Sequence, residues 1–214
     1  MNLSMTSRGF TWLFLALTAF SFSVRAEPVE QKDPQVMISA LSTMLVDKLN
    51  AQRAELEKSP KMVREFAQQN VLPYVDTEKM ARYAMGKYWR SATDEQKKAF
   101  SDEFTTTLIR SYSQSLLKLN ISSVKVTGMT EEKPGRVTVS SNVLQADGNS
   151  SDVVYRAYLD KKSAKWMIYD VTVEGISMLL NYRKVYIADI SRRGLQAVID
   201  DMKEKNQSFL NSAA

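Results

Sequence analysis

The chain has 214 residues, a formal net charge of +5, and neither cysteine nor histidine. Without cysteine it has no disulfides, thiol nucleophiles or thiolate metal ligands, and without histidine it lacks the usual general base near neutral pH. Serine triads, zinc centres and histidine-based acid–base catalysis are therefore excluded in their ordinary forms. The sequence predicts no catalytic residue, no metal site and no cofactor, in a chain long enough for one domain with a sizeable core.

The first residues have the pattern of a secretory signal peptide. Arg8 precedes an apolar run from Phe10 to Phe22, and Val24-Arg25-Ala26 places small residues at −3 and −1 of a cut after Ala26. A membrane anchor is the alternative, but the run of about thirteen residues is shorter than the ~20 that cross a bilayer. We therefore expect a signal peptide over residues 1–26 and one exported, mature domain over residues 27–214, which begins with a disordered polar segment.

Four helices are predicted before any strand. Asp33-Pro34 and Ser59-Pro60 each join an N-cap residue to a proline at the first helical position, so a helix should begin at each. A short third helix ends at Gly86, and a capping box at residues 93–96 begins a fourth that reaches Leu119. The fourth helix has apolar residues every four positions, for which core packing is the simpler explanation: Phe100, Phe104, Leu108, Tyr112 and Leu116.

The hydrophobic period then changes to two. It predicts strands near residues 124–126, 137–143, 153–159 and 166–173, separated by turns. In the last strand, alternation places Met167, Tyr169, Val171 and Val173 on one face and Trp166, Ile168 and Asp170 on the other. Two helices follow, the second capped by Ser191. The fold class is α+β: an antiparallel sheet of about four strands packed with N- and C-terminal helices.

Charged residues offer few sites for chemistry. Asp170 lies inside an apolar strand, where a buried carboxylate could act as a base; pairing with backbone donors or an arginine is the simpler interpretation. The lysines and arginines are scattered among acids, which is typical of ordinary solvated faces. Because there is no clustered basic stripe, we expect no nucleic-acid partner.

Three segments carry a resemblance to a known family. The longest reads Lys-Trp-Met-Ile-Tyr-Asp-Val-Thr-Val-Glu-Gly-Ile-Ser-Met from Lys165 to Met178, and Asn181-Tyr182-Arg183 follows it. The others are Leu72-Pro73-Tyr74-Val75-Asp76 and the run Gly86 to Thr93, continued by Gln96 and Phe100. In this order they resemble the MlaC family of periplasmic phospholipid-binding proteins, which includes toluene-tolerance auxiliary proteins. Ala164 and Tyr186 depart mildly from the family pattern, where glycine and phenylalanine are common.

The resemblance implies a fold and a function. It implies an NTF2-like domain with a curved sheet wrapped by helices, and an apolar cavity that takes phospholipid acyl chains while the headgroup stays near solvent. It also implies a soluble periplasmic carrier that maintains outer-membrane lipid asymmetry. The implied partners are an outer-membrane lipoprotein–porin complex and an inner-membrane ABC transporter with an MCE-domain subunit.

Alternation and position predict which residues line such a cavity. The strands would contribute Val139, Val143, Tyr155, Ala157, Leu159, Tyr169 and Val171. The mouth would be closed by Met80, Tyr83, Ile176, Met178 and Leu179. The second face of the sheet is also partly apolar, so alternation leaves the choice of face open. Candidates to meet a lipid phosphate are Arg82, Lys87 and Arg183.

Two other functions remain open from the residues alone. One is an NTF2-like enzyme that acts on a small apolar molecule, with Asp170 as base and a tyrosine as hydrogen-bond donor. The other is a carrier of a different apolar ligand, such as a solvent molecule or a quinone. The enzyme requires a buried carboxylate that faces a cavity. Either carrier requires only an apolar cavity.

Overall fold

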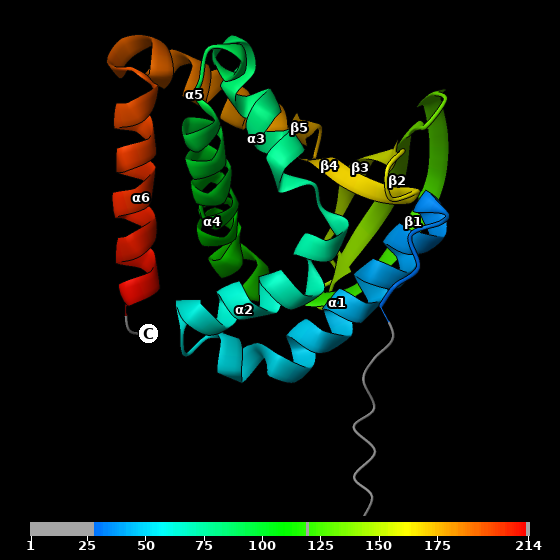
Figure 1. Cartoon of the computed structure of the whole chain (residues 1–214). Helices are drawn as coiled ribbons and strands as arrows, with labels where there is room; N and C mark the ends of the chain where they lie inside the picture. Colours follow the sequence, from blue (N-terminus) through cyan, green and yellow to red (C-terminus); the bar gives the residue numbers. More distant parts are fainter. Residues whose placement is uncertain (1–27, 119, 213–214) are drawn as a thin grey trace, which may run out of the picture.

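The computed structural model describes residues 28–118 and 120–212, and of residues 114–116 only the backbone. The expected signal peptide and the side chain of Leu116 lie outside the described part of the chain. Four helices precede a sheet and two follow it (Figure 1): α1 (Pro34–Leu56), α2 (Pro60–Asn70), α3 (Thr77–Met85), α4 (Asp94–Lys118), α5 (Met178–Arg193) and α6 (Leu195–Asn211). Two short 3-10 helices flank α3: η1 (Leu72–Tyr74) and η2 (Gly86–Arg90).

The predicted helix starts are confirmed by their caps. The Asp33 carboxylate accepts a hydrogen bond from the Val36 amide at 2.9 Å, and the Ser59 hydroxyl accepts one from the Lys61 amide at 3.2 Å. Thr93 and Gln96 exchange the two hydrogen bonds of a capping box before α4. Each cap satisfies amide groups that the first helical turn leaves without partners.

The sheet has five antiparallel strands in sequence order, one more than predicted: β1 (Ile121–Lys133), β2 (Arg136–Gln145), β3 (Ser150–Asp160), β4 (Lys165–Val173) and β5 (Ile176–Ser177). The extra strand exists because Glu174 and Gly175 both adopt positive φ and fold Ile176 back onto Val173. Register shifts interrupt the pairing of β1 with β2, and such irregularities bend and twist a sheet. The α+β fold class with a curved antiparallel sheet is confirmed.

The predicted alternation in β4 is wrong because the strand contains a β-bulge. Ala157 pairs with Ile168 but Arg156 pairs with Asp170, so Tyr169 is the extra residue. Ile168 and Val171 therefore share one face with Ala157 and Tyr155, while Tyr169 packs on the helical side. One inserted residue reverses the facing of everything after it, which a strict two-residue period cannot anticipate.

The boundary between the last two helices also differs from the prediction. Ser191 lies inside α5, and the break comes at Gly194, whose φ of +84° ends the helix. Glycine adopts this left-handed backbone without the steric cost that other residues meet.

The segment before α1 is ordered, contrary to the expected disorder. The Val29 amide donates a 2.9 Å hydrogen bond to the Tyr74 hydroxyl. The Gln31 side-chain amide donates to the carbonyl of Trp166 at 3.1 Å, and the Gln31 carbonyl accepts from the Trp166 amide at 2.9 Å. This segment therefore ties η1 to the edge of β4, and its polar composition reflects hydrogen bonding to backbone groups.

The apolar interior consists of two separate clusters. The sheet cluster joins α1, η1 and one face of the sheet: Met37, Ile38, Leu41, Tyr74, Val137, Val139, Ala157 and Ile168. The helical cluster joins α3, α4, α5 and α6 with Tyr169 of β4, and contains Phe100, Phe104, Tyr186 and Met202. A domain of this size commonly has one contiguous core, so a divided interior is a distinctive feature of this fold.

Helices long and apolar enough to span a membrane are not found in the described ranges, 28–118 and 120–212.

Candidate functional site

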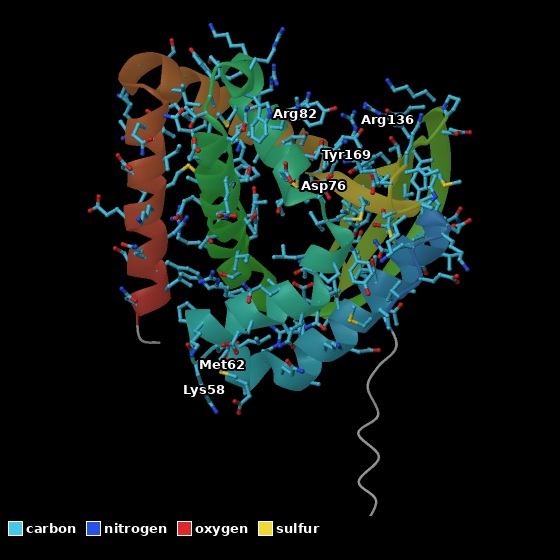
Figure 2. All side chains as sticks on the ribbon, viewed as in Figure 1. Lys58, Met62, Asp76, Arg82, Arg136 and Tyr169 are labelled. Atoms are coloured by element: carbon cyan, nitrogen blue, oxygen red, sulfur yellow. The ribbon has the colours of Figure 1, made fainter. Side chains whose placement is uncertain are left out.

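The segment Leu72 to Asp76 connects the two clusters. Val75 packs against both and forms a parallel bridge with Ile168 on β4. Asp76 caps α3 by accepting from the Lys79 amide at 2.8 Å, and its other carboxylate oxygen accepts from the Tyr158 hydroxyl. Figure 2 shows Asp76 at the start of α3, close to Tyr169 of β4. This segment fixes where the helices sit relative to the sheet.

The segment from Asp170 to Leu179 anchors α5 to the sheet. Asp170 is only 1% exposed, and its carboxylate accepts from the Ser177 hydroxyl at 2.7 Å and from the Leu179 amide at 3.1 Å. The Ser177 hydroxyl in turn accepts from the Leu180 amide at 3.1 Å as the N-cap of α5. The carboxylate is thus occupied at the positive end of a helix, where a negative charge is favourable.

This geometry removes the support for Asp170 as a catalytic base. Both of its oxygens are occupied by groups that hold α5 in place. Among the described residues, no cluster of three or more acidic side chains is arranged to hold a metal ion. The simpler interpretation from the sequence, pairing with backbone and hydroxyl donors, therefore describes Asp170.

A close contact joins α5 to the end of α3. The Arg183 guanidinium donates a 2.7 Å hydrogen bond to the carbonyl of Tyr83 in the last turn of α3. Gly86 follows with φ +55°, and a Cβ atom there would lie 2.9 Å from Cδ1 of Ile187 and 3.2 Å from Nη2 of Arg183. Arg183, a sequence candidate for meeting a lipid phosphate, holds two helices together through this bond.

The first apolar wall of the site is the inner face of the sheet. Val139, Tyr155 and Val171 lie in one row across β2, β3 and β4, as the sequence predicted for this face. Val139 and Ala157 are fully buried beneath α1, so they belong to the packed core. Val143, Tyr155 and Val171 on the same face are only partly buried, although α1 reaches Tyr155 through a hydrogen bond with Ser42.

The second apolar wall belongs to the helices. Phe104 contacts Tyr182 edge-to-face at 5.3 Å between ring centroids, and Tyr182 contacts Tyr112 at 6.3 Å. Leu108, one turn after Phe104, is partly buried against the same cluster. The lining residues predicted from the sequence did not include Leu108, Tyr112 or Tyr182, although the four-residue stripe along α4 pointed to the first two.

The five residues predicted to close the mouth, together with the predicted strand-lining residues Leu159 and Tyr169, do not form one surface. Met80, Tyr169 and Leu179 are buried inside the helical cluster, and Tyr83 is half-buried with its ring 6.0 Å from that of Tyr169. Met178 is half-buried, whereas Ile176 and Leu159 are exposed. The side on which each of them packs depended on the bulge in β4 and on the position of α5.

Two neighbouring grooves run along α4, with volumes of about 460 and 550 Å³. They share Thr77, Asp102 and Thr105, and most of their lining is polar or charged. They are therefore unlike the apolar cavity expected for acyl chains, and no pattern in the sequence indicated them.

The buried tyrosines of both walls are neutral at physiological pH. Burial raises the pKa values of Tyr112, Tyr155 and Tyr169. Burial also raises the pKa of Tyr186 to about 12, partly offset by a hydrogen bond to Thr107. An uncharged phenol suits an apolar wall, because its ring packs against hydrocarbon while its hydroxyl keeps a polar partner.

The raised pKa of Tyr186 predicts a loss of stability in alkali. The unfolded chain releases the phenol proton near pH ~10, whereas the folded chain holds it to about pH 12. The stabilisation is therefore complete below about pH 10 and decreases above it, by roughly 2–3 kcal/mol at pH ~12. Urea unfolding between about pH 8 and about pH 12 measures it. Tyr186→Phe should reduce the decline, and an undiminished decline in this variant would contradict the assignment.

A curved antiparallel sheet, helices packed on both faces of β4 and an apolar interior divided into two clusters define a class of α+β domain in which the buried carboxylate has a structural role. The model of the MlaC protein family matches residues 39–204. The chain belongs to the MlaC family.

Individual relatives agree with this assignment. The chain is 26% identical over 208 residues to the intermembrane phospholipid transport system binding protein MlaC of Haemophilus influenzae, covering 95% of both chains. It is 25% identical over 193 residues to the toluene tolerance protein ttg2D of Pseudomonas putida, covering 90% of this chain and 86% of the relative. The fold matches a Ralstonia solanacearum phospholipid-binding protein, solved with a phospholipid, at a TM-score of 0.75 and 22% identity over 83% of this chain and 98% of that one.

Proposed function

We propose that this protein is a periplasmic carrier that binds phospholipid by its acyl chains and moves it between membranes, without catalysing a reaction. The observation that carries the proposal is the division of the apolar interior, with partly buried aliphatic and aromatic walls on the sheet and on α4–α5. Family membership supports it, since one relative is named for intermembrane phospholipid transport and another was solved with a phospholipid.

The physical need for a carrier is large. Removing a methylene from an apolar environment into water costs ~0.8 kcal/mol, so a lipid with two chains of about fourteen methylenes is held in its bilayer by roughly 22 kcal/mol. That corresponds to about sixteen orders of magnitude against passage through water. A carrier has to replace nearly all of this contact, and no covalent step is required. The scarcity of reactive side chains in this chain fits such a task.

We place the acyl chains between the two walls. The sheet would contribute Val143, Tyr155 and Val171, and the helices Leu108, Tyr112, Tyr182 and Met178. The neutral phenols add apolar area without a charge that hydrocarbon would exclude. The proposed partners are those of a lipid shuttle: a lipoprotein–porin complex in the outer membrane and an ABC transporter with an MCE-domain subunit in the inner membrane. The signal peptide, cleaved after Ala26, would deliver the protein to the periplasm between them.

The proposal is tested by chemical identification of the ligand. Protein purified from cells is extracted with chloroform, and the extract is analysed by mass spectrometry. Diacyl phospholipid in near-stoichiometric amount is expected. Protein that folds but contains no lipid, or contains a quinone or another small apolar molecule, would contradict the proposal and favour the other carrier.

A filling substitution tests where the chains lie. Leu108→Trp places a bulky ring on the helical wall, and overfilling an apolar site costs ~1–3 kcal/mol, so lipid per protein should fall about tenfold. Leu144→Trp is the matched control, because Leu144 is exposed on β2 and, as the neighbour of Val143 in the strand, faces the opposite side of the sheet. Circular dichroism establishes that each variant is folded. Equal lipid content in the two variants would exclude Leu108 from the binding site.

A further inference from the structure

Two stretches of the chain contain basic residues and no acids. Residues 79–93 carry four lysines and arginines, and residues 175–188 carry two more, with no aspartate or glutamate in either. The whole sequence has a net charge of +5, so these six cations leave a net charge of −1 for all the rest. The basic excess of the protein is therefore concentrated in two short stretches that are far apart in the sequence.

The fold brings the two stretches together. They form most of α3, η2 and the first three turns of α5, and Arg183 joins them through its 2.7 Å hydrogen bond to the Tyr83 carbonyl. Gly86 allows η2 to lie directly against Ile187 of α5. Figure 1 shows α3, α5 and β5 at the same end of the molecule, and Figure 2 shows Arg82 on α3 at this end. We call this surface the α3–α5 face.

The cations of the α3–α5 face have no acidic partners. Arg82, Lys87, Arg90 and Lys184 are exposed, and within the described part of the chain none lies within 4.0 Å of a carboxylate. At the other end of α5 the arrangement is the opposite, since Arg192 and Arg193 both pair with Asp189. The positive potential of this face is therefore not neutralised locally.

Large aliphatic side chains are exposed on the same face. Ile176 at β5 is 68% exposed, Leu180 in the first turn of α5 is 59% exposed and Val185 is 54% exposed. Lys184 lies one helical turn after Leu180, so an aliphatic side chain and a cation project from one side of α5. Exposed aliphatic groups that lie together are typical of interaction surfaces.

We propose that the α3–α5 face docks directly on an anionic phospholipid bilayer. Exposed aliphatic side chains among unpaired cations are the combination that binds a membrane interface, where apolar groups enter the headgroup layer and cations meet phosphates. A protein partner would normally present charges of both signs, whereas residues 79–93 and 175–188 carry six cations and no acid, and the exposed Glu78 and Glu174 lie only at their borders. Such docking would place the carrier at a membrane surface whether or not a protein complex is engaged.

Vesicle flotation tests the proposal with the purified protein. Vesicles of phosphatidylcholine alone are compared with vesicles that also contain phosphatidylglycerol, at low and at high salt. Each cation near the surface is worth about fivefold in binding, so the triple variant Arg82→Gln, Arg90→Gln, Lys184→Gln should bind anionic vesicles about a hundredfold more weakly. High salt should weaken the wild-type protein in the same direction, because surface charges are then screened.

The control has the same change of charge at another place. Lys133, Lys161 and Lys162 are exposed at turns of the sheet, and replacing all three with glutamine should leave most of the binding intact.

A second variant, Ile176→Ser with Leu180→Ser, should weaken binding to anionic vesicles without a change of charge, whereas Val36→Ser on α1 should not. Equal losses in the two charge variants, or no binding by the wild-type protein, would overturn the proposal. Lipid extracted from the same variants reports acyl-chain binding separately, so failure of one proposal does not imply failure of the other.

Discussion

Replacing Gly86 with valine is expected to lower the free energy of unfolding by about 3–5 kcal/mol. Two costs combine: strain at positive φ, roughly 1–3 kcal/mol, and overpacking in a close contact, roughly 1–3 kcal/mol. Gly86 has φ +55°, and its missing Cβ would lie 2.9 Å from Cδ1 of Ile187. The side chain of Arg183, which holds the end of α3, would be displaced as well. Urea unfolding of the purified variant measures the loss.

Two other glycines separate these costs. Gly148 has φ +88°, but no atom lies within 4 Å of the place that a Cβ would take, so Gly148→Val should show the strain alone, about 1–2 kcal/mol. Gly128 has neither a positive φ nor a close neighbour, and Gly128→Val should change stability by less than about 0.5 kcal/mol. If Gly86→Val were no more destabilising than Gly148→Val, the contact between η2 and α5 would not be as tight as described.

Removing the carboxylate of Asp170 is the second large effect. Asp170→Ala leaves the Ser177 hydroxyl and the Leu179 amide without their acceptor inside the protein, and hydrogen bonds to a charged group contribute ~1.5–3 kcal/mol each. We expect a loss of about 3–4 kcal/mol in the free energy of unfolding. The amides of α5 should become accessible to solvent before those of the other helices. Hydrogen exchange of the α5 amides, compared with those of α1, locates the loss. Asp152→Ala, on an exposed aspartate of β3, is the matched control and should be nearly neutral.

Asp170→Asn distinguishes a structural role from a catalytic one. The amide keeps an oxygen to accept from Leu179, and its NH₂ group can donate to the Ser177 hydroxyl, whose own proton then loses its acceptor, so the charge and one hydrogen bond are lost, about 1–3 kcal/mol. Lipid content per folded protein should equal that of the wild type. A folded Asp170→Asn variant that loses a measurable turnover of any small substrate would restore the enzyme hypothesis.

Much of the fold was predictable because it depends on local signals. Asp33-Pro34, Ser59-Pro60 and the capping box at Thr93 each specify a helix start through hydrogen bonds that form within one turn. The two-residue period identified four strands, because alternate side chains of a strand face opposite sides wherever one side is buried. These features involve residues only a few positions apart, and a sequence displays them directly.

The candidate site was less predictable, because single residues altered its geometry. Because Tyr169 is the extra residue of the bulge, its ring packs on the helical side. Trp166 and Ile168 lie on the inner face of the sheet, together with Val171 after the bulge. Val139 and Ala157 share the face predicted for them with Tyr155 and Val171, but the depth to which α1 covers them could not be read from alternation. The helical wall formed by Leu108, Tyr112 and Tyr182 required knowing that α5 returns to pack beside α4.

The sequence by itself determined the absence of histidine and cysteine chemistry, the helix starts, the strand period and the family resemblance, since each depends on composition or on neighbours along the chain. Only the tertiary structure decided that the apolar interior is divided, that Asp170 caps α5, and that two acid-free stretches form one basic face. Along the sequence those cations looked scattered among acids, because α4 and strands β1–β4 separate residues 79–93 from residues 175–188. Charge acts through space, so its clustering appears only after the chain has folded.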